Sequence, residues 1–286
     1  MVNQKFKNSA LLALKQITNI EEELKELYVQ PDRAIYLAPN QKLIFKVYSE
    51  GSVLKKEADM LIKAREVKVL VPKVIALIEE EPTVLVMEAI EGSPLTEKSV
   101  DAAREFGEYI ERFHNLEAHP PFSNGQMTWD SFVITWANKE LSELKTMNIF
   151  AEYEVYWLIN HFSSFKEILK TRPIKFLHGD LQPAHILVNT ETDKVTGIID
   201  FADTQPGDPL MDIAVLSLWD TELASLVLAG YKSIENNETT QSLIELYRLL
   251  RKIGEIPWLL KRDFKERAQR DIDSIKETLE IKTLTN

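Results

Sequence analysis

Two short apolar segments with acidic residues near their outer ends constrain the fold of this chain more than any other feature. The segments are HILVN, which begins at His185, and VTGIIDF, and the polar stretch TETDK separates them. Their lengths and the turn between them predict a β-hairpin. Asp180 precedes the first segment and Asp200 closes the second, so this hairpin would bring both carboxylates and His185 to one edge. Two carboxylates and one further ligand beside loops suit a divalent cation and a reacting hydroxyl group.

The first ninety residues are predicted to form a small antiparallel sheet with one helix between its strands. Apolar residues recur at helical spacing over residues 1–30, at Leu11, Leu12, Leu14, Ile17, Ile20, Leu24 and Leu27, which predicts a helix there. RAIYLAPNQKLIFKVY is typical of a hairpin that turns at Pro39–Gln41. SVLKKEADMLIKARE predicts a helix, and VPKVIALIEEEPTVLVMEAI predicts two more strands that are separated at Pro82.

The turn-rich EGSPL segment that starts at Glu91 marks the predicted boundary between two lobes. After it, helices are predicted over 97–118 and over much of 129–170, and another follows PGDPLMDIAVLSLW. The tail from Gln241 is predicted to be helical with an interruption at Pro257. The expected fold is therefore α+β, with a β-rich lobe over 1–90 and a larger, mainly helical lobe over 91–286.

Composition excludes several classes of protein. The chain of 286 residues is 44% hydrophobic and 28% charged, as in ordinary soluble globular proteins. It has no cysteine, which excludes disulfides, thiolate metal sites and thiol catalysis. The formal net charge of −11 argues against nucleic acid as a partner and is compatible with cationic small ligands.

The location and partners are also expectations from composition. No apolar run approaches the ~20 residues that span a bilayer, and polar residues interrupt the N-terminal stretch, which is unlike a signal peptide. A cytoplasmic protein without a membrane partner, monomeric or weakly dimeric, is expected. Its partner would be a small hydroxylated molecule.

The two segments around the hairpin also carry a resemblance to a known family. HGDLQPAHILV followed by GIIDFADTQPGDPLMDIA is similar to the aminoglycoside phosphotransferase family, whose relatives are the choline kinases and, more distantly, the protein kinases. The family pattern is His-Gly-Asp, four residues, Asn, a strand pair that ends in Ile-Asp, then Gly-Asp-Pro and another Asp. Only the Asn is missing, because His185 stands there. Lys46 in LIFKVY, Glu57 in LKKEADML and the segment VLVMEAIEG extend the likeness over nearly the whole chain.

The resemblance implies a bilobal protein-kinase-like fold that holds a nucleotide between its lobes. The implied reaction is transfer of the γ-phosphoryl group of ATP or GTP to an alcohol, with Mg²⁺ as cofactor. Asp180 would be the catalytic base that orients the substrate hydroxyl and accepts its proton. Asp200 would bind the metal. Lys46 would contact the α- and β-phosphates and would be held by an ion pair with Glu57.

The resemblance also assigns the remaining site residues. The backbone of Met87, Glu88, Ala89 and Ile90 would bind the purine edge. The loop at Gln30–Asp32 would cover the phosphates, without the glycines of a protein kinase loop. Structural support would come from three residues around the catalytic segment: His178, Asp208 and Asp212.

His185 distinguishes this chain from most of the family. It occupies the position of the Asn that binds the second metal ion, and an imidazole is an unusual ligand for Mg²⁺, which prefers oxygen. The macrolide 2′-phosphotransferases resemble this chain at that position. His185 is therefore interpreted as a metal ligand, and a macrolide is the favoured acceptor. An aminoglycoside or a hydroxylated metabolite stays open.

Two other functions compete with this interpretation. The missing Asn is compatible with a nucleotide-binding pseudokinase. A serine/threonine protein kinase is disfavoured, because Gly179 stands where those enzymes carry Arg and no glycine-rich loop is present. P-loop kinases are excluded, because the chain has no Gly-Lys-Ser/Thr sequence.

Overall fold

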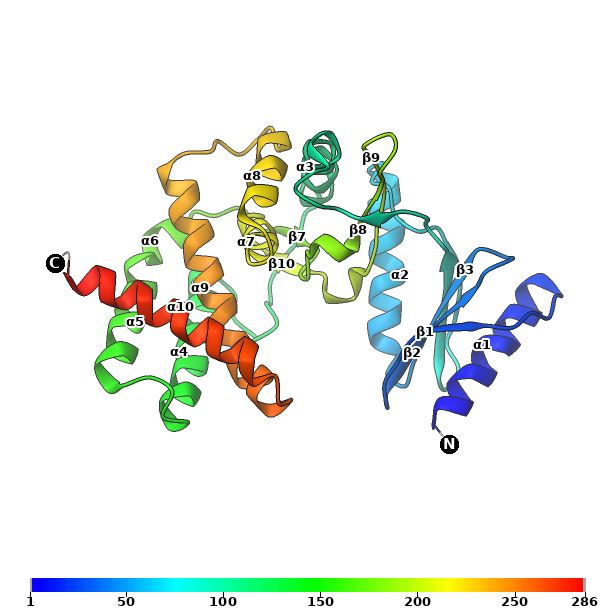
Figure 1. The fold of residues 1–286 in the computed structure, drawn as a ribbon, viewed down its shortest axis with the longest axis horizontal. Helices are drawn as coiled ribbons and strands as arrows, with labels where there is room; N and C mark the ends of the chain where they lie inside the picture. Colours follow the sequence, from blue (N-terminus) through cyan, green and yellow to red (C-terminus); the bar gives the residue numbers. More distant parts are fainter. Residues whose placement is uncertain (1, 285–286) are drawn as a thin grey trace. The chain divides into compact units, whose positions relative to one another are not determined.

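The computed structural model describes residues 2–284, which divide into two compact units. The first unit comprises residues 2–115, 178–204 and 225–233, and the second comprises 116–177, 205–224 and 234–284. Figure 1 shows the order of the elements along the chain. Each unit has its own core and is described by itself.

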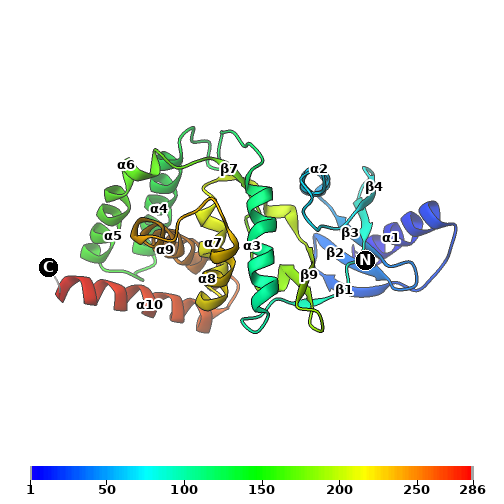
Figure 2. The same ribbon diagram turned by 90° about the horizontal axis from the view of Figure 1, so that it is seen from above.

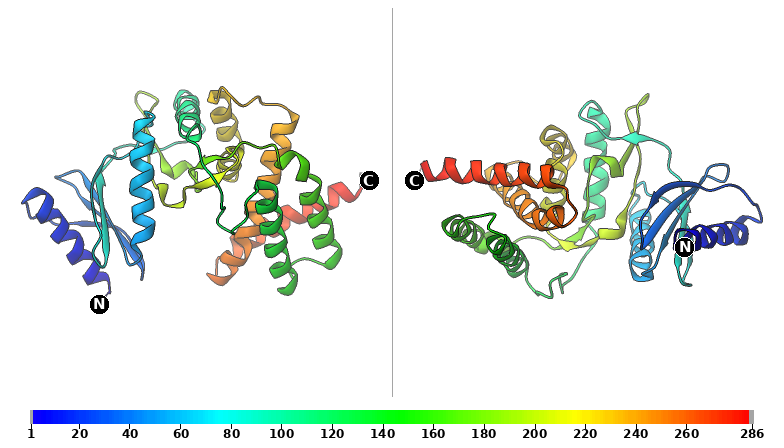
Figure 3. Two further views of the ribbon diagram at one scale, coloured as in Figure 1. Left: turned by 180° about the vertical axis from the view of Figure 1, so that it is seen from behind. Right: turned by 60° about the horizontal axis from the view of Figure 1, so that its bottom comes forward.

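A five-stranded antiparallel sheet forms the N-terminal part of the first unit. Its strand order is β1-β2-β3-β5-β4. The strand bounds are β1 Lys25–Val29, β2 Arg33–Ala38, β3 Leu43–Tyr48, β4 Val74–Ile78 and β5 Thr83–Glu88. Helices α1 (Val2–Thr18) and α2 (Gly51–Glu66) cover opposite faces of this sheet (Figures 1 and 3). The predicted sheet, with one helix between β3 and β4, is confirmed.

Alternation along β2 shows how this sheet is buried. Tyr36 is fully buried, and it joins Phe6 and Leu14 of α1 in one apolar cluster. Ile35 and Leu37 point to the other face and remain partly accessible. Since successive side chains of a strand point to opposite faces, α1 seals one face of the sheet and leaves the other to line a cavity.

The predicted helix over residues 1–30 is wrong in its second half. The helix ends at Thr18, and residues 25–29 form β1 instead. Asn19 has a φ of 56°, in the left-handed region where a helix ends. Leu24 and Leu27 continue the helical spacing only by coincidence, because one is buried in the sheet cluster and the other lies on β1.

A second, smaller sheet belongs to the same unit. Its order is β6-β8-β9, and β8 and β9 form the hairpin predicted from HILVN and VTGIIDF. The other elements of this part are the 3-10 helices η1 and η2 and helix α3. Their bounds are β6 Ser93–Pro94, α3 Val100–His114, η1 Pro183–His185, β8 Ile186–Asn189, β9 Lys194–Ile198 and η2 Phe201–Asp203. Helix α8 (Thr221–Gly230) crosses the boundary between the units.

Helices dominate the second unit, as Figure 2 shows for α4, α5, α9 and α10. The helix bounds are α4 Trp129–Thr146, α5 Glu152–Ser164, α6 Lys166–Leu169, α7 Leu210–Ser217, α9 Glu238–Lys261 and α10 Lys265–Leu284. Strands β7 (Lys175–Leu177) and β10 (Gln205–Gly207) pair with each other. The predicted interruption at Pro257 is wrong, because α9 continues through this buried proline. The helix ends at Lys261 instead, just before Asp263 with its φ of 64°.

The α+β fold class, β-rich at the N-terminus and mainly helical at the C-terminus, is confirmed. The first compact unit continues past the predicted lobe boundary at residue 90. The division into a nucleotide-binding lobe and a catalytic lobe concerns function and stays a prediction. Among the described residues, no helix combines the length and apolar character needed to cross a membrane.

Candidate functional site

Gly179 sets the backbone of the segment that carries Asp180. Its φ is 87°, and a Cβ at this position would collide with the backbone oxygen of Asp203. Both the dihedral angle and the close approach require glycine. An arginine here, as in protein kinases, would therefore not fit between the two backbone segments.

Asp180 presents a partly accessible carboxylate. Its side chain is 28% exposed, and the amide Nε2 of Gln182 donates a hydrogen bond to Oδ2 over 2.7 Å. The sequence did not single out Gln182. One hydrogen bond to one oxygen fixes the orientation of the carboxylate and leaves acceptor positions for a substrate hydroxyl.

His185 lies between the two acidic residues. Its Nδ1 is 2.8 Å from the backbone oxygen of Asp180, and its Nε2 is 3.7 Å from Oδ2 of Asp200. A carbonyl oxygen can only accept, so we assign the proton to Nδ1. In the tautomer that carries its proton on Nδ1, the lone pair of Nε2 points toward Asp200.

Asp200 lies at the end of the hairpin in a left-handed conformation, with a φ of 68° and a ψ of 62°. Its Oδ1 accepts a hydrogen bond from Nζ of Lys46 over 2.8 Å, while Oδ2 faces His185. A non-glycine residue in this region is a source of local strain of the kind found at functional sites. The hairpin thus places Asp180, His185 and Asp200 at one edge, as its geometry was expected to do.

Lys46 connects this edge to the large sheet. It comes from β3, is 6% exposed and forms an ion pair of 2.6 Å with Glu57 of α2. Burial alone would lower the pKa of Lys46, but the carboxylates of Glu57 and Asp200 outweigh it and raise the pKa. The amine is therefore charged at neutral pH.

The two carboxylates around Lys46 respond differently to their surroundings. Burial raises the pKa of Glu57, which is fully enclosed, against the opposing effect of Lys46. Burial also disfavours ionised Asp200, but Lys46 outweighs this effect and lowers the pKa of Asp200. One cation shared by two acids leaves the cluster with a net negative charge, which is an attractive environment for a further cation.

The residues predicted to give structural support lie in both units. In the first, buried His178 donates from Nε2 to the backbone oxygen of Ile199 over 3.0 Å, and its ring packs edge-on against Phe201 at 4.7 Å. It thereby links the Asp180 segment to the end of the hairpin. In the second unit, Asp208 and Asp212 are both fully buried.

Asp208 is the acceptor at the centre of a buried network in the second unit. Arg172 donates to it from Nε over 2.6 Å and from Nη2 over 3.1 Å. The hydroxyl of Tyr247 donates over 2.7 Å, and the backbone N–H of Leu210 donates over 3.1 Å. Trp129 Nε1 donates in turn to the Tyr247 hydroxyl over 2.8 Å. These contacts support the structural role that was predicted for Asp208.

A cavity of about 550 Å³ lies in the first unit, and the cluster of Lys46, Asp200 and His185 forms one polar part of its wall. Lys46, His185 and Asp200 line it together with a largely apolar set: Leu27, Ile35, Leu37, Pro39, Ile44, Pro72, Met87, Leu187 and Ile199. The sequence analysis missed most of this apolar set. Alternation along β2 was the available signal, because Ile35 and Leu37 occupy the face opposite the buried Tyr36.

The linker residues 88–91 also line this cavity, and their backbone groups are only partly available. The N–H of Glu88 donates to Lys73, and the N–H of Ala89 donates to Lys42. Met87 is paired within the sheet and contributes its side chain. Within the described residues, the N–H of Ile90 has no backbone partner. Of the four predicted purine contacts, Ile90 therefore offers the free donor.

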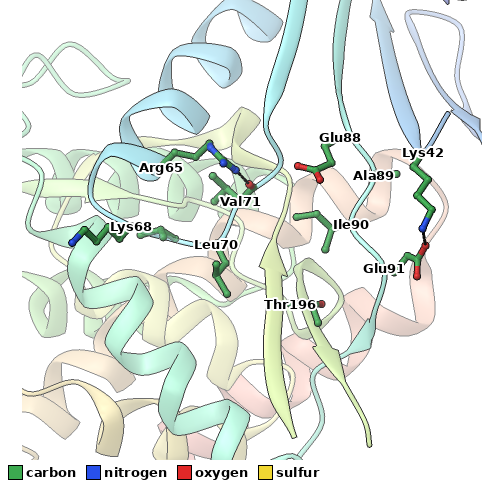
Figure 4. Close-up of a pocket in the computed structure, with 11 residues that line it drawn as sticks. Lys42, Arg65, Lys68, Leu70, Val71, Glu88, Ala89, Ile90, Glu91 and Thr196 are labelled. Carbon is green, nitrogen blue, oxygen red and sulfur yellow. Dashed lines mark hydrogen bonds and ion pairs between the residues drawn. The ribbon is translucent and has the colours of Figure 1, made fainter. Parts of the chain in front are cut away.

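A second cavity of about 590 Å³ shares the linker as part of its wall. Figure 4 shows its lining, in which Arg65 donates to the backbone of Val71 and Lys42 pairs with Glu91. Neither Asp180, His185 nor Asp200 lines it. Lys46, His185 and Asp200 line the first cavity instead.

The loop at Gln30–Asp32 is a tight hairpin turn between β1 and β2. The N–H of Gln30 donates to Arg33, and the backbone oxygen of Asp32 accepts from Ser49. Its expected role in covering phosphates stays a prediction. Over residues 2–284, no group of three or more histidine or acidic side chains is arranged as a metal site.

Solved structures of aminoglycoside phosphotransferases share this fold. The GDP complex of wild-type aminoglycoside 2'-phosphotransferase-IIIa has a TM-score of 0.74 and 19% identity, over 96% of this chain and 98% of that chain. The streptomycin–ATP–APH(2")-IIa ternary complex has a TM-score of 0.65 and 19% identity, over 91% and 95% of the two chains. A ternary complex of a thermostable APH(4)-Ia mutant with AMP-PNP and hygromycin B has a TM-score of 0.69 and 16% identity, over 93% and 97%. At these identities the likeness shows the fold alone.

Sequence comparison gives the family directly. A comparison with curated proteins found no match. Residues 32–246 match the phosphotransferase enzyme family. This range holds strands β2 to β5 of the large sheet, the Lys46–Glu57 pair, the hairpin and the Asp208 segment. The match covers well over half of the chain and confirms the resemblance found in the sequence. The chain therefore belongs to the phosphotransferase enzyme family.

Proposed function

We propose that this protein is a small-molecule kinase that transfers the γ-phosphoryl group of a nucleoside triphosphate to a hydroxyl group of an antibiotic. The observation that carries the proposal is the continuous set of contacts from Glu57 through Lys46 and Asp200 to His185 and Asp180. Three members of this set, Lys46, His185 and Asp200, line a cavity whose other walls are largely apolar. The set supplies a cation for phosphates, a carboxylate for a metal and a second carboxylate for an alcohol.

The cavity suits a nucleotide because its two ends differ in chemistry. The apolar walls from β2, β3 and Leu187 offer space for a flat base, and the free N–H of Ile90 offers a donor to its edge. Lys46 at the polar end would contact the α- and β-phosphates. Its ion pair with Glu57 holds the amine in place before the nucleotide arrives.

In the proposed reaction, Asp180 orients the acceptor alcohol and takes up its proton. The alcohol oxygen forms the new bond to the γ-phosphorus, the bond from that phosphorus to the bridging oxygen breaks, and the nucleoside diphosphate leaves. No covalent intermediate with the protein is needed, because positioning and charge neutralisation carry most of the catalysis. Gln182 and Gly179 act here only by holding the Asp180 carboxylate and backbone in place.

The donor atoms present, one carboxylate oxygen and one imidazole nitrogen, fit a divalent cation. Oδ2 of Asp200 and Nε2 of His185 face each other across 3.7 Å, and Oδ1 of Asp200 is already oriented by Lys46. Mg²⁺ in kinases is commonly held by one or two protein groups plus phosphate oxygens and water, so two protein donors are sufficient. When bound, the ion would neutralise the phosphate charge.

The acceptor class is inferred from two sources. Structures with the same fold hold streptomycin, gentamicin or hygromycin B in their complexes, which favours a hydroxylated antibiotic. His185 at the Asn position favours a macrolide, and an aminoglycoside is the second choice. The monomeric or weakly dimeric state and the cytoplasmic location stay predictions from composition.

The test is a panel of macrolides, aminoglycosides and small alcohols, each incubated with the protein and either ATP or GTP. Mass spectrometry should detect an acceptor heavier by one phosphoryl group, and the Asp180→Ala variant should not form it. Absence of any phosphorylated acceptor in the presence of a bound nucleotide would contradict the proposal.

The second candidate is a nucleotide-binding pseudokinase, and His185 in place of Asn is the observation that favours it. Metal-dependent hydrolysis of ATP or GTP separates the two functions. A kinase should show slow hydrolysis that disappears in Asp180→Ala and in Asp200→Ala. A pseudokinase would bind nucleotide, as a thermal shift would show, and would hydrolyse none.

A further inference from the structure

The tautomer of His185 is fixed by a backbone contact. Nδ1 donates to the carbonyl of Asp180 over 2.8 Å, so the neutral ring can offer only Nε2 as a ligand. The side chain is 14% exposed, which leaves a small accessible area at the cavity. Histidines that bind metals commonly donate their other ring nitrogen to a carbonyl or carboxylate, because this orients the ring and raises its basicity.

The second donor is also held in place. Asp200 is anchored through Oδ1 by Lys46, and its Oδ2 lies 3.7 Å from Nε2 of His185. One imidazole nitrogen and one carboxylate oxygen therefore face the same small volume. This donor pair differs from the oxygen-only set that Mg²⁺ prefers.

Ligand chemistry predicts a consequence for the choice of ion. Imidazole suits first-row transition ions, and the affinity of mixed nitrogen and oxygen sites rises from Mn²⁺ to Co²⁺ and beyond. Mg²⁺ prefers oxygen ligands, gives up its water reluctantly and gains little from a nitrogen donor. The pair His185–Asp200 therefore lowers the advantage of Mg²⁺ relative to these ions.

We propose that His185 is a specificity-determining residue that makes this site select Mn²⁺ or Co²⁺ over Mg²⁺ by direct ligation through Nε2. The proposal rests on the proposed function for the presence of a metal, and it adds the identity of the favoured ion and of the atom that selects it. Selection does not require turnover, so it can be measured by binding alone.

The experiment uses the full chain with Mn²⁺ as the probe, with and without ADP or GDP. Electron spin echo spectroscopy of bound Mn²⁺ detects a directly coordinated imidazole as a nitrogen hyperfine coupling. Competition between Mn²⁺ and Mg²⁺, followed by the spin-resonance signal of free Mn²⁺, gives the ratio of the two dissociation constants.

Three variants make the test specific. His185→Gln carries an amide close to the position of Nε2 and keeps a polar side chain of similar length, and His185→Asn introduces the residue that most of the family uses. His119→Gln is the matched control, because His119 is exposed and lies outside the site. Circular dichroism and thermal unfolding establish that each variant folds.

The expected result is a nitrogen coupling in the wild type and in His119→Gln, and its loss in both His185 variants. The preference for Mn²⁺ over Mg²⁺ should fall by about tenfold in the His185 variants, which corresponds to about 1.4 kcal/mol. Bound Mn²⁺ without nitrogen coupling, or an unchanged ratio in both His185 variants, would overturn the proposal. So would a wild-type protein that binds no Mn²⁺ with or without nucleotide.

These outcomes are distinct from failure of the proposed function. A wild type that binds Mn²⁺ through His185 but phosphorylates no acceptor would support this inference and contradict the kinase proposal. An active kinase whose ion preference is the same with and without His185 would support the kinase proposal and contradict this inference.

Discussion

Each unit contains a buried cluster of charged side chains, and the two clusters differ in how completely their groups are satisfied. In the second unit, Asp208 is fully buried and accepts four hydrogen bonds, two of them from Arg172. In the first unit, two acids share Lys46, and within residues 2–284 the Oε2 atom of buried Glu57 has no close hydrogen-bond partner. Asp200 in that cluster is still 38% exposed on its side chain.

The difference indicates different roles for the two clusters. A buried charge that is paired and fully hydrogen-bonded specifies one packing arrangement and offers nothing to a ligand. A cluster with excess negative charge and an accessible carboxylate can still bind a cation or a ligand, as functional sites do. We therefore expect substitutions in the first cluster to affect ligands and activity, and substitutions in the second to affect stability.

The largest effect is expected from Asp180→Asn. The amide keeps the size of the side chain but cannot accept the proton, so kcat should fall by roughly a thousandfold or more. The midpoint of urea unfolding should change little, because this carboxylate makes one side-chain hydrogen bond and is partly exposed. Comparable activity in the variant and the wild type would mean that Asp180 is not the base.

Asp208→Ala should give the largest loss of stability. Partly buried Arg172 and the buried hydroxyl of Tyr247 would lose their acceptor, and the free energy of unfolding should fall by about 3–5 kcal/mol. Asp220→Ala is a matched control, because Asp220 accepts the N–H of Leu223 at the start of α8 and the loss of this cap should cost about 1 kcal/mol. Urea-induced unfolding measures both losses. Equal losses of unfolding free energy in Asp208→Ala and Asp220→Ala would contradict a central role for the Asp208 network.

Lys46→Met tests whether the first cluster serves ligand binding more than stability. Removal of the cation should weaken nucleotide binding by about tenfold to a hundredfold, since a hydrogen bond to a charged group contributes about 1.5–3 kcal/mol. Calorimetric titration with ADP and GDP measures this loss. The loss of stability should be smaller than for Asp208→Ala, because Glu57 can take up a proton, which its raised pKa already favours. Unchanged nucleotide affinity in this variant would mean that Lys46 does not contact the phosphates.

The smallest effect is expected in the pH dependence of stability. The pKa of Asp200 is lowered below 3.8 in the folded protein, so its contribution is present above that value and is lost as the pH falls through the folded pKa. Asp200→Asn should therefore remove part of the acid destabilisation seen in thermal unfolding below about pH 4, and the pH profiles of the two proteins should run parallel between neutral pH and about pH 4. The effect is modest because the side chain is more than one third exposed. Identical pH profiles for both proteins would mean that Lys46 does not stabilise the ionised acid.

Local patterns allowed prediction of the parts of the fold that depend on nearby residues. The hairpin of β8 and β9 and the antiparallel sheet followed from short apolar runs with turns between them. The sequence pattern failed where tertiary packing decides: Leu24 and Leu27 continue a helical spacing after the helix has ended. Pro257 lies inside α9, because packing holds the helix together across the missing hydrogen bond.

In the candidate site, too, short motifs could be predicted and long-range contacts could not. Asp180, His185, Asp200, Lys46 and Glu57 were identified from short motifs, and the hairpin explains why three of them meet. The network of Asp208 could not be derived in this way, because its partners are 36 and 39 residues away in sequence and carry no motif. Long-range partners of this kind are visible only once the chain is folded.

The left-handed backbone at Asp200 has a consequence for laboratory evolution. Glycine adopts this geometry without strain and asparagine tolerates it better than most residues. A library screened only for folded, expressible protein should therefore drift toward glycine or asparagine at position 200. A library screened for the proposed kinase activity should retain the acid, so the residue recovered at position 200 shows which selection acted.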